Sequence, residues 1–382
     1  MQLTQHILPA ERAGFFGIPL DFIFQEMYSP LTTFPHIGKS YVYHKVQRWQ
    51  RGEEILMKAF CGSVRTRAAV IRDSIRDFVV SCFSWRKRLG YFEGWYFKHQ
   101  NEDTVLAFIP GQSVDRRGKK HPFLQIIWNE SSYFLDFKEE DYLVDRRQGK
   151  VLLGNNVFSR RGVKVDLASR DIAVQGTIRY GSLCPIRYPI MGPFRFVPFM
   201  ECRHEIISMS HVLQGKITVN GRVLDFNGEM GYIEGDRGRS FPRDYLWLQC
   251  NRFRENASVM AAVAHIPFMG GSFQGCIAVA CHNGREYRFA TYLGTKIICR
   301  RETAVILKQG DYALKVFLSN RTGDRAARFS HKLTAPSKGE MSRYIKEEHL
   351  VQGRFLLYKE KELIFDLNSR FVSFEFSERH SS

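Results

Sequence analysis

Beyond residue 88, short segments of the chain alternate between apolar and polar residues, and turn sequences separate these segments. Asn-Gly pairs stand at 220–221 and 283–284, and such pairs favour the positive φ angles of a tight hairpin turn. Further reversals are expected at 309–310 and 359–362. Short strands recurring about every 8–12 residues, with no clear helical pattern between them, indicate antiparallel barrels or sandwiches.

The strand-rich region is about 290 residues long, more than one eight-stranded barrel usually needs. The sequence therefore predicts an all-β protein built from two stacked antiparallel barrels. We place the first barrel at residues 89–222 and the second at 223–382, with the two meeting near residues 215–228.

Residues 1–88 have a different pattern and are expected to form a partly helical extension. At about residues 64–82 one side of a helical pattern is apolar: Val64, Ala68, Ile71, Ile75, Phe78, Val79 and Cys82. Such a helix would lie either on a membrane surface or on the protein's own core. Asp73 and Asp77 make docking on the core the favoured alternative.

The net charge of +17 suits nucleic acid, an anionic membrane surface or an acidic ligand. The charge is dispersed along the chain, and no zinc-finger spacing or RNA-recognition motif occurs, so no nucleic-acid partner is expected. The eight cysteines form no CxxC pair, and the first residues lack a signal-peptide pattern. No run of 18 apolar residues occurs. These features predict a cytoplasmic protein, with contact at a membrane surface left open and no prediction of oligomeric state.

The sequence YFEGWYFK at residues 91–98 places a carboxylate among aromatic rings. With a strand period of two, Tyr91, Glu93, Trp95 and Phe97 share one face. Burial among rings raises a carboxyl pKa and would let Glu93 act as an acid. The alternative is a buried carboxylate paired with an arginine, and the residues alone weigh the two about equally.

A second unusual sequence, GYIEGDRGRSFP, covers residues 231–242. Its glycines allow tight turns that would bring Glu234, Asp236, Arg237 and Arg239 close together. These residues would form either a charged cluster at a cavity mouth or a salt-bridged turn that locks the two barrels, and the local residues favour the turn. In either case the arginines are expected to lower the pKa values of the two carboxyls, which suits a base or an anchoring group.

The strand that follows has Tyr245, Trp247, Gln249 and Asn251 on one face. An aromatic face with amides is typical of a ligand pocket, although a plain core with a backbone-bonded glutamine fits about as well. Gln125 stands alone among apolar neighbours in a similar way. No GxSxG, HExxH or paired-histidine spacing is found, and His204, His211 and His265 are expected to be structural, so no metal is predicted.

Six separated motifs occur in the order YFEGWYFKHQ, FLQIIW, LGNNVFSRRGVKVDL, GYIEGDRGRSFPRDYLWLQCN, YRFATYLGTKI and APSKGEM. From about Gly90 to Phe376 this series resembles the tocopherol cyclase family. The resemblance implies a pair of lipocalin-like (calycin) barrels, related also to carotenoid hydratase-type proteins. It further implies closure of a prenylated hydroquinone to a chromanol without a redox cofactor, and a small hydrophobic ligand as partner.

Ring closure of that kind needs a carboxylic acid to protonate a trisubstituted alkene while a phenol oxygen attacks. Glu93 is the first candidate donor, and Glu93→Gln is then expected to abolish turnover; Asp236 and Glu234 are the alternatives. The substrate would contact the residues Tyr91, Trp95, Phe97, Gln125, Tyr232, Tyr245, Trp247, Gln249 and Asn251. A carrier that binds a hydrophobic ligand without catalysis is the second hypothesis.

Overall fold

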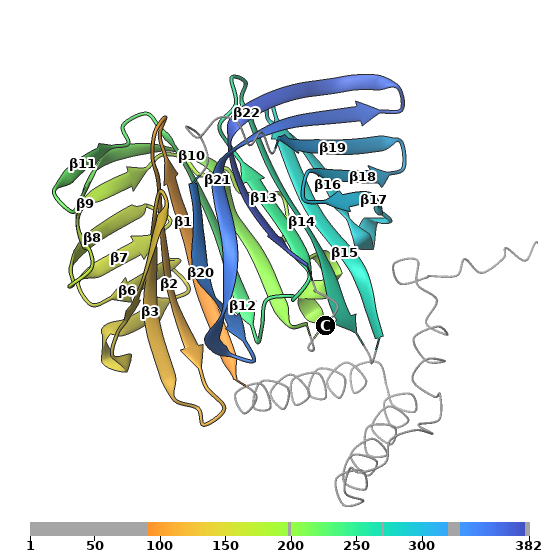
Figure 1. Ribbon diagram of the computed structural model, residues 1–382. Coiled ribbons are helices and arrows are strands. Elements are labelled where there is room, and N and C mark those ends of the chain that lie inside the picture. The colour runs from red at the N-terminus through yellow and green to blue at the C-terminus, as the bar shows by residue number, and fades with distance from the viewer. Residues whose placement is uncertain (1–89, 198–199, 269–270, 320–328, 379–382) are drawn as a thin grey trace, which may run out of the picture. The chain divides into compact units, whose positions relative to one another are not determined.

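The computed structural model describes residues 90–197, 200–268, 271–319 and 329–378. The extension predicted at 1–88, with its helix at 64–82, lies outside the described residues. Nearly all described elements are strands, which form two antiparallel sheets in tandem (Figure 1). The predicted all-β fold with two tandem antiparallel assemblies is confirmed.

The first sheet has the strand order β4-β3-β2-β1-β12-β10-β9-β8-β7-β6-β5, with β11 paired to β10. Its strands are β1 (Tyr91–Gln100), β2 (Val105–Val114), β3 (Lys120–Trp128), β4 (Ser131–Asp136), β5 (Tyr142–Asp145), β6 (Lys150–Leu153), β7 (Asn156–Ser159), β8 (Gly162–Ala168), β9 (Ala173–Tyr180), β10 (Cys202–Val219), β11 (Arg222–Asp225) and β12 (Met230–Gly238). Two short 3-10 helices, η1 (Glu139–Asp141) and η2 (Gly192–Phe196), interrupt the connections.

The second sheet has the order β16-β15-β14-β13-β22-β21-β19-β18-β17, with β20 paired to β21. Its strands are β13 (Tyr245–Cys250), β14 (Ala257–Phe268), β15 (Gly271–His282), β16 (Arg285–Ala290), β17 (Lys296–Arg301), β18 (Ala304–Gln309), β19 (Tyr312–Ser319), β20 (Phe329–Ser337), β21 (Glu340–Lys359) and β22 (Glu362–Ser377). The 3-10 helix η3 (Thr291–Leu293) follows β16.

Each sheet pairs its first strand in the sequence with its last. β1 is hydrogen-bonded to β12 in the first sheet, and β13 to β22 in the second. Each sheet is therefore complete within one continuous segment, and the chain passes from one to the other between Gly238 and Tyr245. The division into two barrels at residues 222 and 223 stays a prediction.

The two Asn-Gly pairs form the hairpins that the sequence predicts. Asn220 and Gly221 join β10 to β11 with φ angles of 47° and 80°, and Asn283 and Gly284 join β15 to β16 with 48° and 77°. Both residues of such a turn need positive φ, which asparagine and glycine adopt at low cost.

Three apolar clusters fill the described part of the chain. One belongs to the first sheet and one to the second, while a third takes residues from both. The central strands contribute to two clusters because successive side chains point to opposite faces. On β1, Phe97 lies in the first sheet's cluster and Tyr96 in the shared one; on β13, Leu246 lies in the second sheet's cluster and Trp247 in the shared one.

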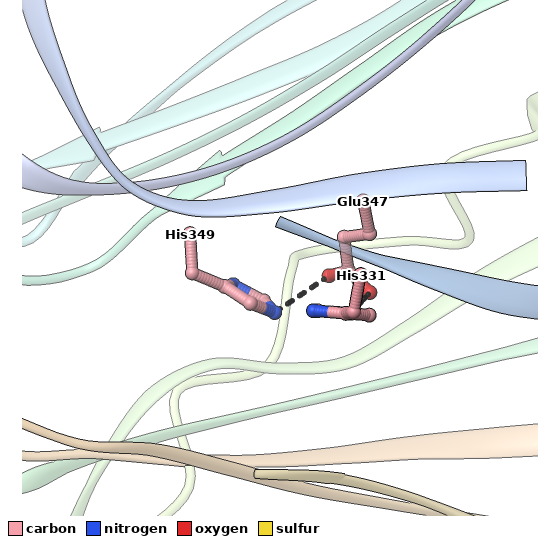
Figure 2. A group of neighbouring side chains, drawn as sticks. All are labelled: His331, Glu347 and His349. Atoms are coloured by element: carbon pink, nitrogen blue, oxygen red, sulfur yellow. Dashed lines mark ion pairs between the residues drawn. The ribbon is translucent and has the colours of Figure 1, made fainter. Parts of the chain in front are cut away.

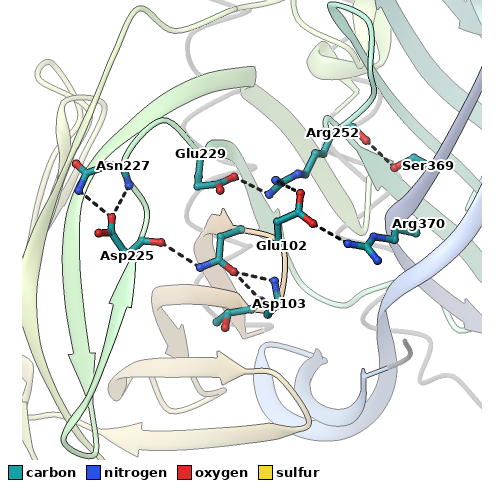
Figure 3. Close-up of polar contacts among 10 residues, drawn as sticks. Glu102, Asp103, Asp225, Asn227, Glu229, Arg252, Ser369 and Arg370 are labelled. Carbon is teal, nitrogen blue, oxygen red and sulfur yellow. Dashed lines mark hydrogen bonds and ion pairs between the residues drawn. The ribbon is translucent and has the colours of Figure 1, made fainter. Parts of the chain in front are cut away.

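A polar junction also connects the sheets (Figure 3). Arg252, after β13, donates to Glu229 at 2.6 Å and to Glu102 at 2.8 Å. Both acceptors belong to the first sheet's segment: Glu229 directly precedes β12, and Glu102 follows β1. Arg370 on β22 donates to the other oxygen of Glu102 at 2.7 Å. Glu102 therefore lies between two arginines of the second sheet, and the contact that joins the sheets here uses different arginines from Arg237 and Arg239.

Candidate active site

A pocket of about 200 Å³ lies in the shared layer, between β1, β2, β3, β10 and β12 of the first sheet and β13, β14, β15, β20, β21 and β22 of the second. Its wall is mainly apolar and aromatic and includes Phe92, Phe123, Phe194, Phe241, Phe273 and Trp247. Among these stand a few polar groups: Tyr96, Gln125, His204, Glu234, Asp236, Tyr245 and Glu375. A mostly apolar cavity with a few converging polar groups is typical of a small-molecule site.

Glu234 on β12 is the most completely enclosed carboxyl of the pocket wall, with 6% of the residue exposed. Its Oε2 accepts hydrogen bonds from the Tyr232 hydroxyl at 2.6 Å and from Trp247 Nε1 at 3.3 Å. Burial is the main cause that raises the pKa of Glu234 from 4.5 to about 7, against the opposing charge of His204. Near neutral pH this carboxyl can therefore both donate and accept a proton.

His204 on β10 lies between Glu234 and Asp236. Its Nδ1 is 3.0 Å from Asp236 Oδ1, and its Nε2 is 3.4 Å from Glu234 Oε2. Burial lowers the pKa of His204, but the charges of Asp236 and Glu234 outweigh it and raise the pKa to about 9. A protonated imidazole thus connects the two carboxyls at neutral pH.

These three side chains lie within 4.8 Å of one another and could also surround a cation. Tyr232 and Trp247 already donate to Glu234 Oε2, and His204 Nδ1 bonds to Asp236 Oδ1, while His204 Nε2 has only an ion-pair contact with Glu234. An acid–base group is the simpler description of this cluster.

A second acid faces the pocket from β22. Glu375 lies opposite Trp247 in the sheet and accepts a hydrogen bond from the Tyr245 hydroxyl. Burial and the nearby charge of Glu347 raise the pKa of Glu375 well above 4.5. The pocket wall therefore holds two carboxyls that are held toward the neutral form.

The sequence misses two of these groups, because they come from strands far from the motifs. His204 was expected to be structural, yet it lies directly across from Asp236 in the pairing of β10 with β12. Glu375 gives no local signal beyond its position in an apolar strand.

Glu93 points away from this pocket, since β1 presents Phe92, Gly94 and Tyr96 to the pocket wall instead. The Glu93 carboxylate is paired with Arg146, and the hydroxyls of Tyr91 and Tyr142 lie 3.3 and 3.4 Å from it. Of the two alternatives that the sequence left open, these contacts match the carboxylate tied to an arginine.

Trp95 and Phe97 share the face of Glu93 and pack on the first sheet's cluster, and together with Tyr91 they are not part of the pocket wall. Of the other predicted contact residues, Gln125, Tyr245 and Trp247 line the pocket. Tyr232 lies behind the wall and holds Glu234.

Gln249 and Asn251 are buried but make structural bonds outside the wall. Gln249 accepts from Lys98 Nζ at 2.8 Å, and Asn251 donates to the carbonyl of Gly231 at 2.7 Å. Gln125 exchanges two hydrogen bonds with the backbone of Thr334, which anchors β3 to β20.

The expectation that Arg237 and Arg239 lower the pKa of Glu234 is wrong. Glu234 and Asp236 share the pocket face of β12, so the alternation of a strand turns Arg237, which is exposed, to the opposite face. The pKa of Glu234 is raised because burial dominates and the nearest cation is His204.

Among the described residues, no helix has the length and apolar character needed to cross a membrane.

Known proteins resemble part of this chain. Residues 164–294 match a family model described as "Tocopherol cyclase-like". The chain is 21% identical over 267 residues to "Probable tocopherol cyclase, chloroplastic" of Oryza sativa subsp. japonica, covering 54% of this chain and 57% of that protein. It is also 21% identical over 267 residues to "Tocopherol cyclase, chloroplastic" of Zea mays, covering 54% of this chain and 56% of that protein.

The chain thus spans a little over half the length of these curated relatives. A crystal structure of a candidate AttH from Nitrosomonas europaea is similar with a TM-score of 0.41 and 9% identity, over 75% of this chain and 91% of that one. The matched residues 164–294 include His204, Glu234 and Asp236. The resemblance to the tocopherol cyclase-like family that the sequence motifs indicated is therefore confirmed.

Proposed function

We propose that this protein is an acid-catalysed cyclase that closes a prenylated phenol or a related isoprenoid to a chromanol-type ring. The proposal combines the family resemblance with one structural observation, the protonatable Glu234 in an aromatic pocket. The hydrophobic ligand would reach the pocket from a membrane surface, with which the protein would be in peripheral contact.

Glu234 has the properties that the first step demands. Protonation of a trisubstituted alkene requires an acid that is still neutral near pH 7, and an exposed glutamic acid is almost fully ionised there. Burial supplies the neutral form of Glu234, and the Tyr232 and Trp247 donors stabilise the carboxylate that remains after the proton has left.

The step balances without any other reagent. The Glu234 O–H bond breaks and its proton forms a C–H bond at the less substituted alkene carbon, which leaves a tertiary cation. The phenol oxygen attacks this cation and forms the C–O bond, and the phenol proton returns to the Glu234 carboxylate. Substrate and product are isomers, so no redox cofactor is required.

Aromatic rings around Glu234 suit the cationic intermediate. Trp247 and Tyr96 lie 6.0 Å apart between ring centroids, and both line the pocket next to Glu234. The π face of such a ring stabilises a desolvated cation by about 2 kcal/mol. The same apolar wall keeps out water, which would otherwise capture the cation as an alcohol.

A carrier of a hydrophobic ligand is the second candidate, because the mainly apolar wall alone would serve it. The two functions differ in what happens to the ligand. A carrier needs no acid within reach of the ligand and returns it unchanged.

Incubation of the purified protein with prenylated hydroquinones in D₂O separates the two. A cyclase yields a product of the substrate's composition with one carbon-bound deuterium, detected by mass spectrometry, because Glu234 exchanges its proton with solvent. Recovery of bound but unchanged ligand would refute the cyclase and support the carrier. Mass spectrometry of lipids that co-purify with the protein identifies the ligand class directly.

A further inference from the structure

A group of two histidines and one glutamate lies in the second sheet (Figure 2). His331 on β20 is directly across from Glu347 on β21, and His349 is two residues further along β21. This register and the period of two bring all three side chains to one place. They are buried, with exposures of 5% for His331 and 0% for Glu347 and His349.

The nitrogen and oxygen atoms of these side chains converge. His331 Nε2 is 3.5 Å from Glu347 Oε2, and His349 Nε2 is 3.3 Å from Glu347 Oε1. The two imidazole rings lie side by side with centroids 5.1 Å apart. One ligand atom from each residue lies within 4.8 Å of the others.

Three of the converging atoms lack a hydrogen-bond partner among the described residues: His331 Nε2, His349 Nε2 and Glu347 Oε2. A buried polar atom without a partner destabilises the fold unless something compensates it. Each neutral imidazole carries one N–H of its own, but the contacts of His331 Nε2 and His349 Nε2 with Glu347 are long, at 3.5 and 3.3 Å. A cation between the three groups would satisfy one atom of each residue at once.

Neighbouring residues hold the rings and the carboxylate from outside. His349 Nδ1 is 2.7 Å from Ser373 Oγ, which also accepts from Lys98 Nζ at 2.7 Å. When Nδ1 carries the proton and donates it to Ser373, the lone pair of Nε2 points toward Glu347. The Tyr96 hydroxyl donates to Glu347 Oε1 at 2.8 Å. Outer hydrogen bonds of this kind fix the orientation of metal ligands in proteins.

We propose that His331, Glu347 and His349 form a buried binding site for a divalent first-row transition metal ion. Two imidazoles and one carboxylate are ligands that Zn²⁺ accepts, whereas Ca²⁺ and Mg²⁺ prefer oxygen ligands alone. Because Tyr96 bonds to Glu347 and also lines the pocket, the bound ion would fix one wall of that pocket. The proposal of a metal site does not rest on the proposed cyclase activity, because its ligands lie outside the pocket wall.

Zn²⁺ is the probe for the test, on the full chain purified without a polyhistidine tag. Inductively coupled plasma mass spectrometry of protein refolded with Zn²⁺ and then dialysed is expected to give one equivalent per chain. His331→Gln is expected to lose this equivalent and the accompanying rise in Tm. His282→Gln removes a histidine that pairs with Glu255 elsewhere on the second sheet, and His204→Gln removes one from the pocket, so both controls should retain the metal.

X-ray absorption at the zinc edge covers the case in which the His331 variant does not fold. The wild-type spectrum is expected to show two imidazoles in the first coordination shell. Folded wild-type protein that binds no Zn²⁺ at micromolar concentrations would overturn the proposal. Equal binding by His331→Gln, or loss of the metal in His204→Gln alone, would overturn it as well.

Discussion

The state of Glu234 decides the chemistry of the pocket at the scale of single residues. Burial favours the neutral form of this carboxyl, whereas the hydrogen bonds from Tyr232 and Trp247 and the charge of His204 favour its ionised form. The group is thereby poised between acid and base. The pKa of the nearby His204 is raised to about 9, so at neutral pH this imidazole keeps a positive charge next to the carboxylate.

The pH dependence of turnover follows from the pKa of Glu234. Only the neutral carboxyl donates a proton, so kcat should be highest below pH 7 and fall about tenfold per pH unit above it. Steady-state rates between pH 5.5 and 9 test this. A rate that rises through pH 7 would assign the essential group to a base.

His204 should contribute stability that is lost as pH rises, because it binds its proton more tightly in the folded state. The folded pKa is about 9 against 6.5 for a free imidazole, so the stabilisation is complete below pH 6.5 and is lost as pH rises through 9. Urea unfolding from pH 6 to 9.5 measures the slope. His204→Gln should flatten the curve, and an unchanged curve would contradict the electrostatic role.

Glu93→Gln should affect stability and leave turnover intact, since its contacts with Arg146, Tyr91 and Tyr142 lie outside the pocket wall. Loss of the charged partner of the half-exposed Arg146 should cost about 1–2 kcal/mol. Chemical denaturation and a turnover assay on the same preparation provide the two readings. Lost turnover in a folded variant would return Glu93 to the catalytic role.

At the scale of strands, glycine substitutions test the pairing of neighbouring strands. Gly284 has a positive φ of 77° in open space, so Gly284→Ala should cost only about 1 kcal/mol. Gly215 on β10 has a φ of 137°, and an added Cβ would lie 2.2 Å from the carbonyl oxygen of Thr177 on β9. Gly215→Ala should therefore cost at least about 3 kcal/mol. Urea unfolding of the two variants measures both losses of stability, and equal losses would contradict the close pairing of β9 with β10 at Gly215.

The sequence predicts strands and hairpins well, because period-two patterns and Asn-Gly turns are local signals. It also groups side chains on a face correctly, as for Tyr245 and Trp247 on β13. It does not say which face meets the pocket. Both faces of β1 are buried against apolar clusters, so no contrast between polar and apolar residues could distinguish the face of Glu93 from that of Tyr96.

The parts of the site that escaped prediction share one cause, which is pairing between distant strands. His204 meets Asp236 through the pairing of β10 with β12, and His331 meets Glu347 through that of β20 with β21. A search for histidine pairs at helical spacing cannot find a cluster assembled across strands. Desolvation depends on the same packing, which explains why the pKa direction of Glu234 was also mispredicted.

At the scale of the whole described fold, the pocket exists only while the two sheets stay together. The polar junction of Glu102, Glu229, Arg252 and Arg370 fastens them at one end. Arg252→Ala should cost about 2 kcal/mol, because the Arg252 side chain is 17% exposed and holds two carboxylates. Arg370→Ala, 56% exposed, should cost less than about 1 kcal/mol. Urea unfolding measures both changes in stability, and equal changes would contradict the larger contribution assigned to Arg252.

Turnover of a prenylated hydroquinone by Glu234→Gln tests the central claim most directly. The amide keeps the size of the side chain and its bond from Tyr232 but has no acidic proton, so kcat should fall by about 100-fold or more. Glu93→Gln, assayed beside it, should retain activity. A folded Glu234→Gln protein that cyclises the substrate at the wild-type rate would contradict the account.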